Sequence, residues 1–316
     1  MGAPTVVVYD PITTLRWNYD VERDTLAARG VDLVLPADLD AARKALPKAD
    51  VVVASGRLPR EELDLMTRCC GILCYSVGMD GVDTARAAEL GIEVTNVPDY
   101  CTEEVSDQAI ALLMAVQRAL VPMASAAAAG QWEVRELPEF YMIRRVRGQR
   151  IGVVGLGRIG TRVAEKAHGL GMTVVAYDPY RTEAPFPLVP LNDLLDESDA
   201  VVLCAALTAD SRHVLDAAAI GRLRPDAVVV NVARGGLIDE AALAAALKAG
   251  RLRGAGLDVR EVEPPPVPDP LSGLTNVVLT QHVGATSVEA FADMHTLSAA
   301  RIIDLLDRHG RLREAS

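Results

Sequence analysis

The sequence has few lysines, few cysteines and no long apolar run. Only four lysines occur among 316 residues and none lies in the motifs described below, so we expect no lysine Schiff-base chemistry. The five cysteines are an odd number, with no CxxC pair and no histidine at metal-ligand spacing, which argues against a disulfide framework and against a metal site. We therefore expect reduced cysteines that mostly pack in the core.

The charge and the hydropathy exclude two classes of partner. The net charge of −11 argues against nucleic acid, whose phosphates are usually met by a clustered basic surface. Half of the residues are apolar, yet no apolar run reaches the roughly 20 residues that a membrane helix needs. The first residues lead into the strand-like run Val6–Tyr9 without a basic and then apolar leader. We expect no membrane span and a cytoplasmic location.

Apolar runs of strand length alternate with Ala- and Leu-rich helical stretches, which is typical of parallel sheets covered by helices. The fold class is therefore α/β, and the length predicts two domains. We expect a linking helix from about Thr102 to Leu120 and a final amphipathic helix over Val288–Arg308. The predicted strands fall into two series, 6–9, 32–35, 51–54, 71–75 and 93–95, then 151–154, 173–177, 200–204, 227–231, 254–258 and 277–280.

A glycine motif opens the second series. The strand Ile151–Val154 is followed at once by Gly155-Leu156-Gly157-Arg158-Ile159-Gly160 and then by a helical run. This order is the dinucleotide fingerprint, in which Gly155 permits a tight turn, Gly157 lets the backbone approach a pyrophosphate and Gly160 lets helix and strand pack closely. Asp178 ends the next strand, where a carboxylate accepts ribose hydroxyls and repels a 2′-phosphate. NAD is favoured over NADP, although nearby Arg181 leaves NADP open.

The later motifs carry a family resemblance. Asn231-Val232-Ala233-Arg234-Gly235-Gly236, Asp258-Val259 with Glu263-Pro264, and Gln281-His282-Val283-Gly284 follow in order, and Asn96-Val97-Pro98 precedes them. Together they resemble the D-isomer-specific 2-hydroxyacid dehydrogenase family over nearly the whole chain. The resemblance implies a flavodoxin-like substrate domain, residues 1–99 completed by the C-terminal helix 287–316, and a Rossmann NAD-binding domain, residues 100–286. It also implies a homodimer joined through the NAD-binding domains, and the segment 130–147 is where we expect that interface.

The resemblance also implies roles for individual residues. His282 would exchange a proton with the substrate, Glu263 would orient it, and Arg234 would grip the carboxylate and carbonyl of a 2-keto acid. Asp258 matches the position that contacts the nicotinamide carboxamide. The other expected cofactor-binding residues are Gly155, Gly157, Arg158, Ile159, Gly160, Asp178, Thr208, Val232, Ala233 and Gly284, and the loop Ser76-Val77-Gly78 is expected to bind substrate with Arg234.

Different motifs resemble different branches of this family. Tyr100–Asp107 looks like the C-terminal binding protein branch, which supplies an alternative function: sensing NAD(H) and binding protein partners with little turnover. Gly284–Ala290 looks more like the phosphoglycerate dehydrogenase branch, and Gln281 stands where most relatives have proline. The intact set of Arg234, Glu263 and His282 favours the enzyme, an NAD-dependent oxidoreductase that moves a hydride between nicotinamide and C2 of a D-2-hydroxy acid or its 2-keto acid.

Two further departures bear on the substrate. Ala54 and Cys74 occupy positions where the phosphoglycerate branch usually has arginine, so a phosphorylated substrate would lack cationic partners. Arg57 lies close enough in the chain to replace one of them. We expect a 2-keto acid with an uncharged side chain, in a pocket for which Tyr75, Tyr100 and Tyr141 are candidates.

Overall fold

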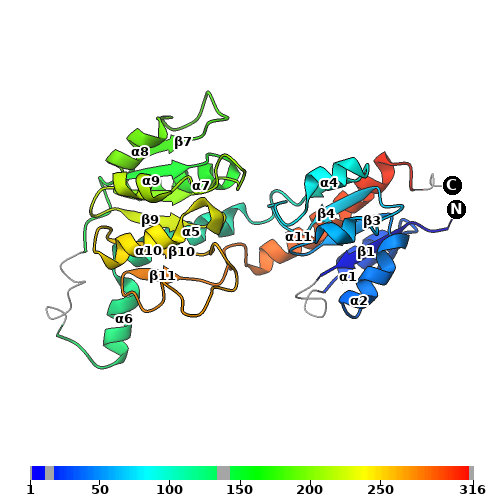
Figure 1. Cartoon of the computed structure of the whole chain (residues 1–316), viewed down its shortest axis with the longest axis horizontal. Coiled ribbons are helices and arrows are strands. Elements are labelled where there is room, and N and C mark those ends of the chain that lie inside the picture. Colours follow the sequence, from blue (N-terminus) through cyan, green and yellow to red (C-terminus); the bar gives the residue numbers. More distant parts are fainter. Residues whose placement is uncertain (1, 11–17, 134–142, 313–316) are drawn as a thin grey trace. The chain divides into compact units, whose positions relative to one another are not determined.

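The computed structural model describes residues 2–10, 18–133 and 143–312. Contacts within the chain divide it into two compact units. Unit 1 comprises residues 1–100 with 287–316, and unit 2 comprises residues 101–286. Each unit contains one open sheet in which every strand pair is parallel, so the predicted α/β class with two parallel-sheet domains is confirmed (Figure 1).

Unit 1 is built on five strands in the order β2-β1-β3-β4-β5, the flavodoxin-like order. Valine fills the buried strands Val6–Val8 and Val51–Val53, as expected for a parallel sheet that is covered on both faces. The C-terminal helix α11 packs on β4 of this unit, where Leu305 fills the space beside Gly71. Its elements are β1 (Thr5–Tyr9), α1 (Asp20–Ala27), β2 (Asp32–Val34), α2 (Leu39–Ala45), β3 (Val51–Ala54), α3 (Arg60–Leu63), β4 (Gly71–Cys74), α4 (Thr84–Glu89), β5 (Glu93–Asn96) and α11 (Val288–Arg308).

Unit 2 is built on six strands in the order β11-β10-β9-β8-β6-β7. The chain runs from β6 to β7 and then returns past β6 to β8, so the strand order reverses between β6 and β8. Ligands of open α/β sheets bind at the carboxyl ends of the strands beside such a reversal. The elements are α5 (Thr102–Gln117), α6 (Leu120–Ala128), β6 (Arg150–Val154), α7 (Arg158–Gly169), β7 (Thr173–Tyr177), α8 (Leu191–Glu197), β8 (Ala200–Leu203), α9 (Ala217–Arg222), β9 (Val228–Asn231), α10 (Glu240–Lys248), β10 (Gly254–Leu257) and β11 (Val277–Leu279).

The helix predicted from Thr102 to Leu120 ends at Gln117 as α5, and a second helix, α6, begins at Leu120. Ala119 adopts a left-handed backbone conformation with φ of 48°, and the two helices meet at a bend of 65°. The first helix belongs to unit 2 and packs on β10, whose Gly254 and Gly256 leave room for Val116 and Leu112. Among the described residues no single helix is both long and apolar enough to cross a membrane; α5 and α6 together reach the required composition, but they are bent.

The cysteines are free thiols, and four of the five are buried. Burial raises the pKa of the Cys69, Cys74 and Cys204 thiols to about 12, so they stay protonated near neutrality. A thiol needs a lowered pKa to act as a nucleophile. Cys101 is 2% exposed at the start of unit 2. These positions are those of packing residues.

Candidate active site

The carboxyl ends of the strands of unit 2 bring together motifs from across the sequence. The glycine motif follows β6, Asp178 follows β7, and Thr208 lies in the loop after β8. Val232, Ala233 and Arg234 follow β9. Asp258 follows β10 and the segment with His282 and Gly284 follows β11. Since all six strands are parallel, these loops share one edge of the sheet.

The glycine motif has the geometry that a dinucleotide requires. Gly155 has φ of +87°, and a Cβ there would lie 2.5 Å from the Ala205 backbone, which follows β8. A Cβ on Gly160 would lie 2.0 Å from the Gly155 carbonyl oxygen. Gly157 caps α7 and faces open space, so the helix N-terminus with Arg158 and Ile159 is open to a phosphate. These residues fit the pyrophosphate of a nicotinamide dinucleotide.

Asp178 is tied to the same loop. Its Oδ2 accepts a hydrogen bond from the Leu156 N–H at 2.8 Å, and its Oδ1 accepts one from the Tyr180 N–H at 3.0 Å. The carboxylate therefore bridges the end of β7 and the turn after β6. A ribose next to the pyrophosphate would meet this charge.

His282 and Glu263 form a hydrogen-bonded pair. His282 Nδ1 lies 2.8 Å from Glu263 Oε2, and Glu263 Oε1 accepts the Arg260 backbone N–H at 2.9 Å. Because Nδ1 is engaged by the carboxylate, Nε2 is the nitrogen that can exchange a proton with a substrate. The His282 side chain is 47% exposed, so it remains accessible.

The pair shifts the pKa of both members. The hydrogen bond to Glu263 raises the pKa of His282 above its ordinary value, against burial and the Arg234 charge, which act to lower it. Burial would raise the pKa of Glu263, but the hydrogen bonds from His282 and the Arg260 amide outweigh it and hold that pKa below its ordinary value. The pairing therefore shifts both groups toward their charged forms, an imidazolium beside a carboxylate.

Asp258 organises the loop that carries His282. Its backbone oxygen accepts the His282 N–H at 2.7 Å, and its carboxylate accepts the N–H groups of Val283 at 3.0 Å and Gly284 at 2.8 Å. His282 has φ of 54°, a left-handed conformation that costs about 1–3 kcal/mol and persists where surrounding bonds fix it. The Thr280 hydroxyl also donates to Asp258 at 2.6 Å. Sequence reasoning predicts Asp258 as a cofactor contact but does not predict these hydrogen bonds or the role of Thr280.

Arg234 lies at the same edge, in the turn after β9. The Arg234 carbonyl accepts Asn231 Nδ2 at 2.9 Å, and Arg234 Nη1 donates to the Ala233 carbonyl at 2.8 Å. Its positive charge acts to lower the pKa of both Glu263 and His282. Val232 is buried. Thr208 is exposed in the loop after β8, where its N–H donates to Ser211 Oγ at 2.8 Å.

The expected substrate loop, Ser76-Val77-Gly78, belongs to unit 1, where it follows β4. Ser76 Oγ donates to the Gly78 carbonyl at 2.6 Å, and Asn96 Nδ2 donates to the Val77 carbonyl at 2.5 Å. All three loop residues are half-buried. The loop is thus ordered by its own unit.

The aromatic candidates for a pocket are placed differently. Tyr75 is 6% exposed, and its hydroxyl donates to the buried carboxylate of Glu22 and lies 2.6 Å from His295 Nδ1. Tyr75, Glu22 and His295 thus form a polar cluster in the interior of unit 1. Tyr100 is also buried, and Tyr141 lies outside the described residues.

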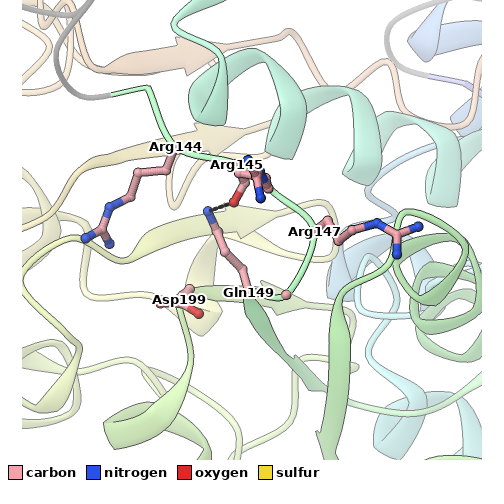
Figure 2. Close-up of a pocket in the computed structure, with 6 residues that line it drawn as sticks. Arg144, Arg145, Arg147, Gln149 and Asp199 are labelled. Atoms are coloured by element: carbon pink, nitrogen blue, oxygen red, sulfur yellow. Dashed lines mark hydrogen bonds between the residues drawn. The ribbon is translucent and has the colours of Figure 1, made fainter.

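A shallow pocket lies at the opposite edge of the sheet of unit 2. Arg144, Arg145, Arg147 and Gln149 line it before β6, together with Asp199 before β8 (Figure 2). Arg144 pairs with Asp226, and the Gln149 side chain donates to the Arg145 carbonyl at 2.8 Å. None of the candidate site residues lines this pocket. Within the described residues, no group of three or more His, Cys, Asp or Glu side chains is placed to hold a metal ion.

Comparison with known proteins identifies the family. The profile of the "D-isomer specific 2-hydroxyacid dehydrogenase, NAD binding domain" matches residues 110–284. A glyoxylate reductase of Korarchaeum cryptofilum is 41% identical over 234 residues, which are 72% of this chain and 70% of the relative. The crystal structure of the TT0316 protein from Thermus thermophilus has a TM-score of 0.83 and 34% identity, covering 96% of this chain and 97% of that one.

A further solved structure bears on the cofactor. The NADPH-dependent glyoxylate/hydroxypyruvate reductase of Sinorhizobium meliloti, in complex with NADP and malonate, has a TM-score of 0.82 and 30% identity, and the match covers the whole of both chains. These relatives do not single out the phosphoglycerate dehydrogenase branch or the C-terminal binding protein branch. Two of these relatives are reductases, so the comparison does not favour the alternative function of sensing NAD(H) and binding protein partners. The chain therefore belongs to the D-isomer-specific 2-hydroxyacid dehydrogenase family and is a nicotinamide-dependent 2-hydroxyacid oxidoreductase, as its motifs predict.

Proposed function

We propose that this protein moves a hydride between NAD(H) and C2 of a small D-2-hydroxy acid or its 2-keto acid, with His282 exchanging the proton. The observation that carries the proposal is the His282–Glu263 pair at the carboxyl edge of a sheet with a dinucleotide motif. The glyoxylate reductase of K. cryptofilum and the glyoxylate/hydroxypyruvate reductase of S. meliloti support a small 2-keto acid as substrate.

The residues divide the chemistry among themselves. When bound, the nicotinamide supplies or accepts the hydride. The Arg234 guanidinium binds the carboxylate and carbonyl oxygens of the keto acid through a fork of N–H donors. During reduction the His282 imidazolium donates its Nε2 proton to the carbonyl oxygen, and in oxidation the neutral imidazole takes the hydroxyl proton. Glu263 keeps Nδ1 protonated and stabilises the imidazolium. Ser76, Val77 and Gly78 remain proposed substrate ligands and Asp258 a proposed carboxamide contact.

A panel of 2-keto acids tests the reaction and the substrate class. We expect NADH oxidation with glyoxylate and with hydroxypyruvate. The kcat/KM for phosphohydroxypyruvate should be lower than that for either compound by about 10-fold or more, because its phosphate carries about two charges that need cationic partners. Ala54 and Cys74 are buried and offer none. The proposal fails if no 2-keto acid supports NADH oxidation.

Arg57 provides the control for the substrate class. Its side chain is exposed just after β3. If phosphohydroxypyruvate has the highest kcat/KM of the panel, the proposal of an uncharged substrate is wrong. If that higher kcat/KM is then lost in Arg57→Ala, Arg57 supplies the missing cation. The Arg57→Ala variant is expected to reduce glyoxylate at the wild-type rate.

The cofactor preference rests on Asp178. We expect the wild type to prefer NADH to NADPH, because the carboxylate at the end of β7 repels a 2′-phosphate. Asp178→Asn keeps an acceptor for the Leu156 N–H but removes the charge, so the preference should narrow by about 10-fold, which corresponds to about 1.4 kcal/mol. Asp178→Ala should lower affinity for both cofactors in addition. A wild type that prefers NADPH would contradict the assignment.

The oligomeric state and the location are proposals about the whole protein. The cytoplasmic location stays a prediction. We propose a homodimer through unit 2, near the segment 130–147, of which residues 134–142 lie outside the described residues. Large apolar side chains are exposed in and before that segment: Trp132 within it is 76% exposed, and on α6 Leu120 is 59% and Val121 46% exposed. Such a surface is typical of an interface.

Sedimentation equilibrium tests the dimer. We expect about twice the chain mass for the wild type and a shift to monomer for Val121→Glu with Trp132→Glu, because a charge placed in an apolar interface is desolvated without a partner. Leu170→Glu, a change at another partly exposed apolar residue of unit 2, serves as control and should leave the mass unchanged. A monomeric wild type contradicts the proposal.

A further inference from the structure

A buried charge cluster lies directly behind the proposed active site. Arg260 is 8% exposed and lies between two carboxylates. Its Nε and Nη2 donate to Glu240 at 2.8 and 3.1 Å, and its Nη1 and Nη2 donate to Asp269 at 3.0 and 2.8 Å. The guanidinium thus makes a forked pair with each acid.

The cluster joins the start of α10 to the segments that follow β10 and precede β11. Glu240 opens α10, Asp269 lies in the turn that leads toward β11, and Arg260 follows β10. Asp269 Oδ1 also accepts the Leu271 N–H at 3.0 Å, so its side chain is fixed in turn. Buried ion pairs contribute little net stability, because desolvation offsets most of their attraction. What such a cluster does supply is a defined geometry.

That geometry bears on two of the proposed catalytic residues. The Arg260 N–H donates to Glu263 Oε1 at 2.9 Å, while the other oxygen of the same carboxylate binds His282. A Cβ on Gly235 would lie 1.9 Å from the Arg260 carbonyl carbon, so the Arg260 backbone also lies against the turn that carries Arg234. Moving Arg260 would therefore disturb both the acid–base pair and the guanidinium.

We propose that Arg260 is a positioning residue: its side chain, held by Glu240 and Asp269, fixes the backbone N–H that aims Glu263 at His282 and the backbone that supports the Arg234 turn. This inference rests on the proposed function, because it assigns His282 as the proton donor. Arg260 itself touches neither reacting atom.

The direction in which the pKa of His282 changes distinguishes a positioning role of Arg260 from a direct effect of its charge. The groups that act on His282 are Glu263, Arg234 and Asp258. Removing the positive charge of Arg260 would, through electrostatics alone, favour the imidazolium and raise the pKa of His282. A loosened Glu263 instead forms a weaker hydrogen bond, which lowers the pKa of His282. The two explanations predict opposite signs.

The test is the pH profile of keto-acid reduction in Arg260→Gln, with NADH saturating. Reduction needs the imidazolium, so its rate falls as the pH rises through the pKa of His282. We expect this alkaline limb to move to lower pH by roughly half to one pH unit and kcat to fall about 10-fold. Glu263→Gln serves as the reference, and its alkaline limb should move in the same direction by a larger amount. Arg260→Lys, which keeps the charge but not the fork, should move the limb in the same direction.

Arg253→Gln is the matched control. Arg253 is 7% exposed in the same unit, donates to the Gln117 carbonyl at 3.0 Å and precedes β10, at the edge of the sheet away from the site. We expect it to lower Tm but leave the pH profile unchanged. An alkaline limb that stays in place or moves up in both Arg260 variants overturns the proposal.

Two measurements keep the outcome interpretable. If Arg260→Gln does not fold, Arg260→Lys gives the test, because it keeps the positive charge and removes part of the forked pairing. Titration of the His282 ring signals by NMR reads the imidazole pKa without turnover, and the expected downward change applies there too. Full activity in His282→Ala would refute the proposed function, whereas an unmoved His282 titration in the Arg260 variants would refute only this inference.

Discussion

His282→Ala is expected to lower kcat for 2-keto acid reduction by about 10³-fold while NADH binds as in the wild type. A positioned general acid contributes about 10²- to 10⁴-fold, and no other described histidine joins this pair. The alanine removes the Nε2 proton donor, but the glycine motif and Asp178 are untouched. The measurements are the single-turnover rate of NADH oxidation and the Kd of NADH from its fluorescence.

His213→Ala is a closely matched control. His213 lies in the same unit, has a left-handed backbone with φ of 51°, and pairs through Nε2 with Glu261 Oε1 at 2.7 Å. It therefore resembles His282 in backbone conformation and in the kind of partner, but it lies in the loop after β8, its N–H donates to the Gly236 carbonyl at 2.9 Å, and its carboxylate partner is Glu261 and not Glu263. We expect its rate to stay within about threefold of the wild type, because its imidazole is not the proposed proton donor. Equal losses in the two variants would mean that His282 is structural.

The strands were predictable because their signal is local. Val51–Ala54 and Ala200–Leu203 are continuous apolar runs that contain valines and are preceded by an aspartate, and each forms a buried strand with ends within one residue of the prediction. The end of the linking helix was predicted to within three residues of Gln117, but the second helix α6, which begins at Leu120, was not predicted. Ala119 joins the two helices in a left-handed backbone conformation, and because alanine favours the right-handed region its residue type gives no sign of this turn.

The candidate site follows the same division. The glycine motif and the ordered Arg234, Glu263 and His282 motifs are visible as short patterns, because each sits at a strand end. The roles of Arg260, Glu240 and Asp269 are not visible, because a charged residue in a loop is usually solvated and only the fold brings these three together. The network on the Asp258 carboxylate is hidden for the same reason.

Arg234→Gln is expected to lower kcat/KM for 2-keto acids by about 10³-fold, because two charge-assisted hydrogen bonds to the substrate contribute roughly 2 kcal/mol each. The variant should also change the pH profile of the remaining activity. The Arg234 charge acts to lower the pKa of His282, so removing it raises that pKa. Since the imidazolium is the active form in reduction, the alkaline limb moves to higher pH, opposite to the change expected for Glu263→Gln.

Arg234→Lys separates the two effects of the guanidinium. A lysine keeps the positive charge but cannot form the planar fork, so kcat/KM should stay low, by about 10- to 100-fold, while the alkaline limb returns toward its wild-type position. Both variants are compared by kcat/KM for glyoxylate between pH 5 and pH 10, with the Kd of NADH measured alongside. An Arg234→Gln profile whose limb stays in place would place Arg234 away from His282. Loss of NADH binding equal to the loss of turnover would make Arg234 a cofactor ligand, because a substrate ligand affects the keto acid and not the dinucleotide.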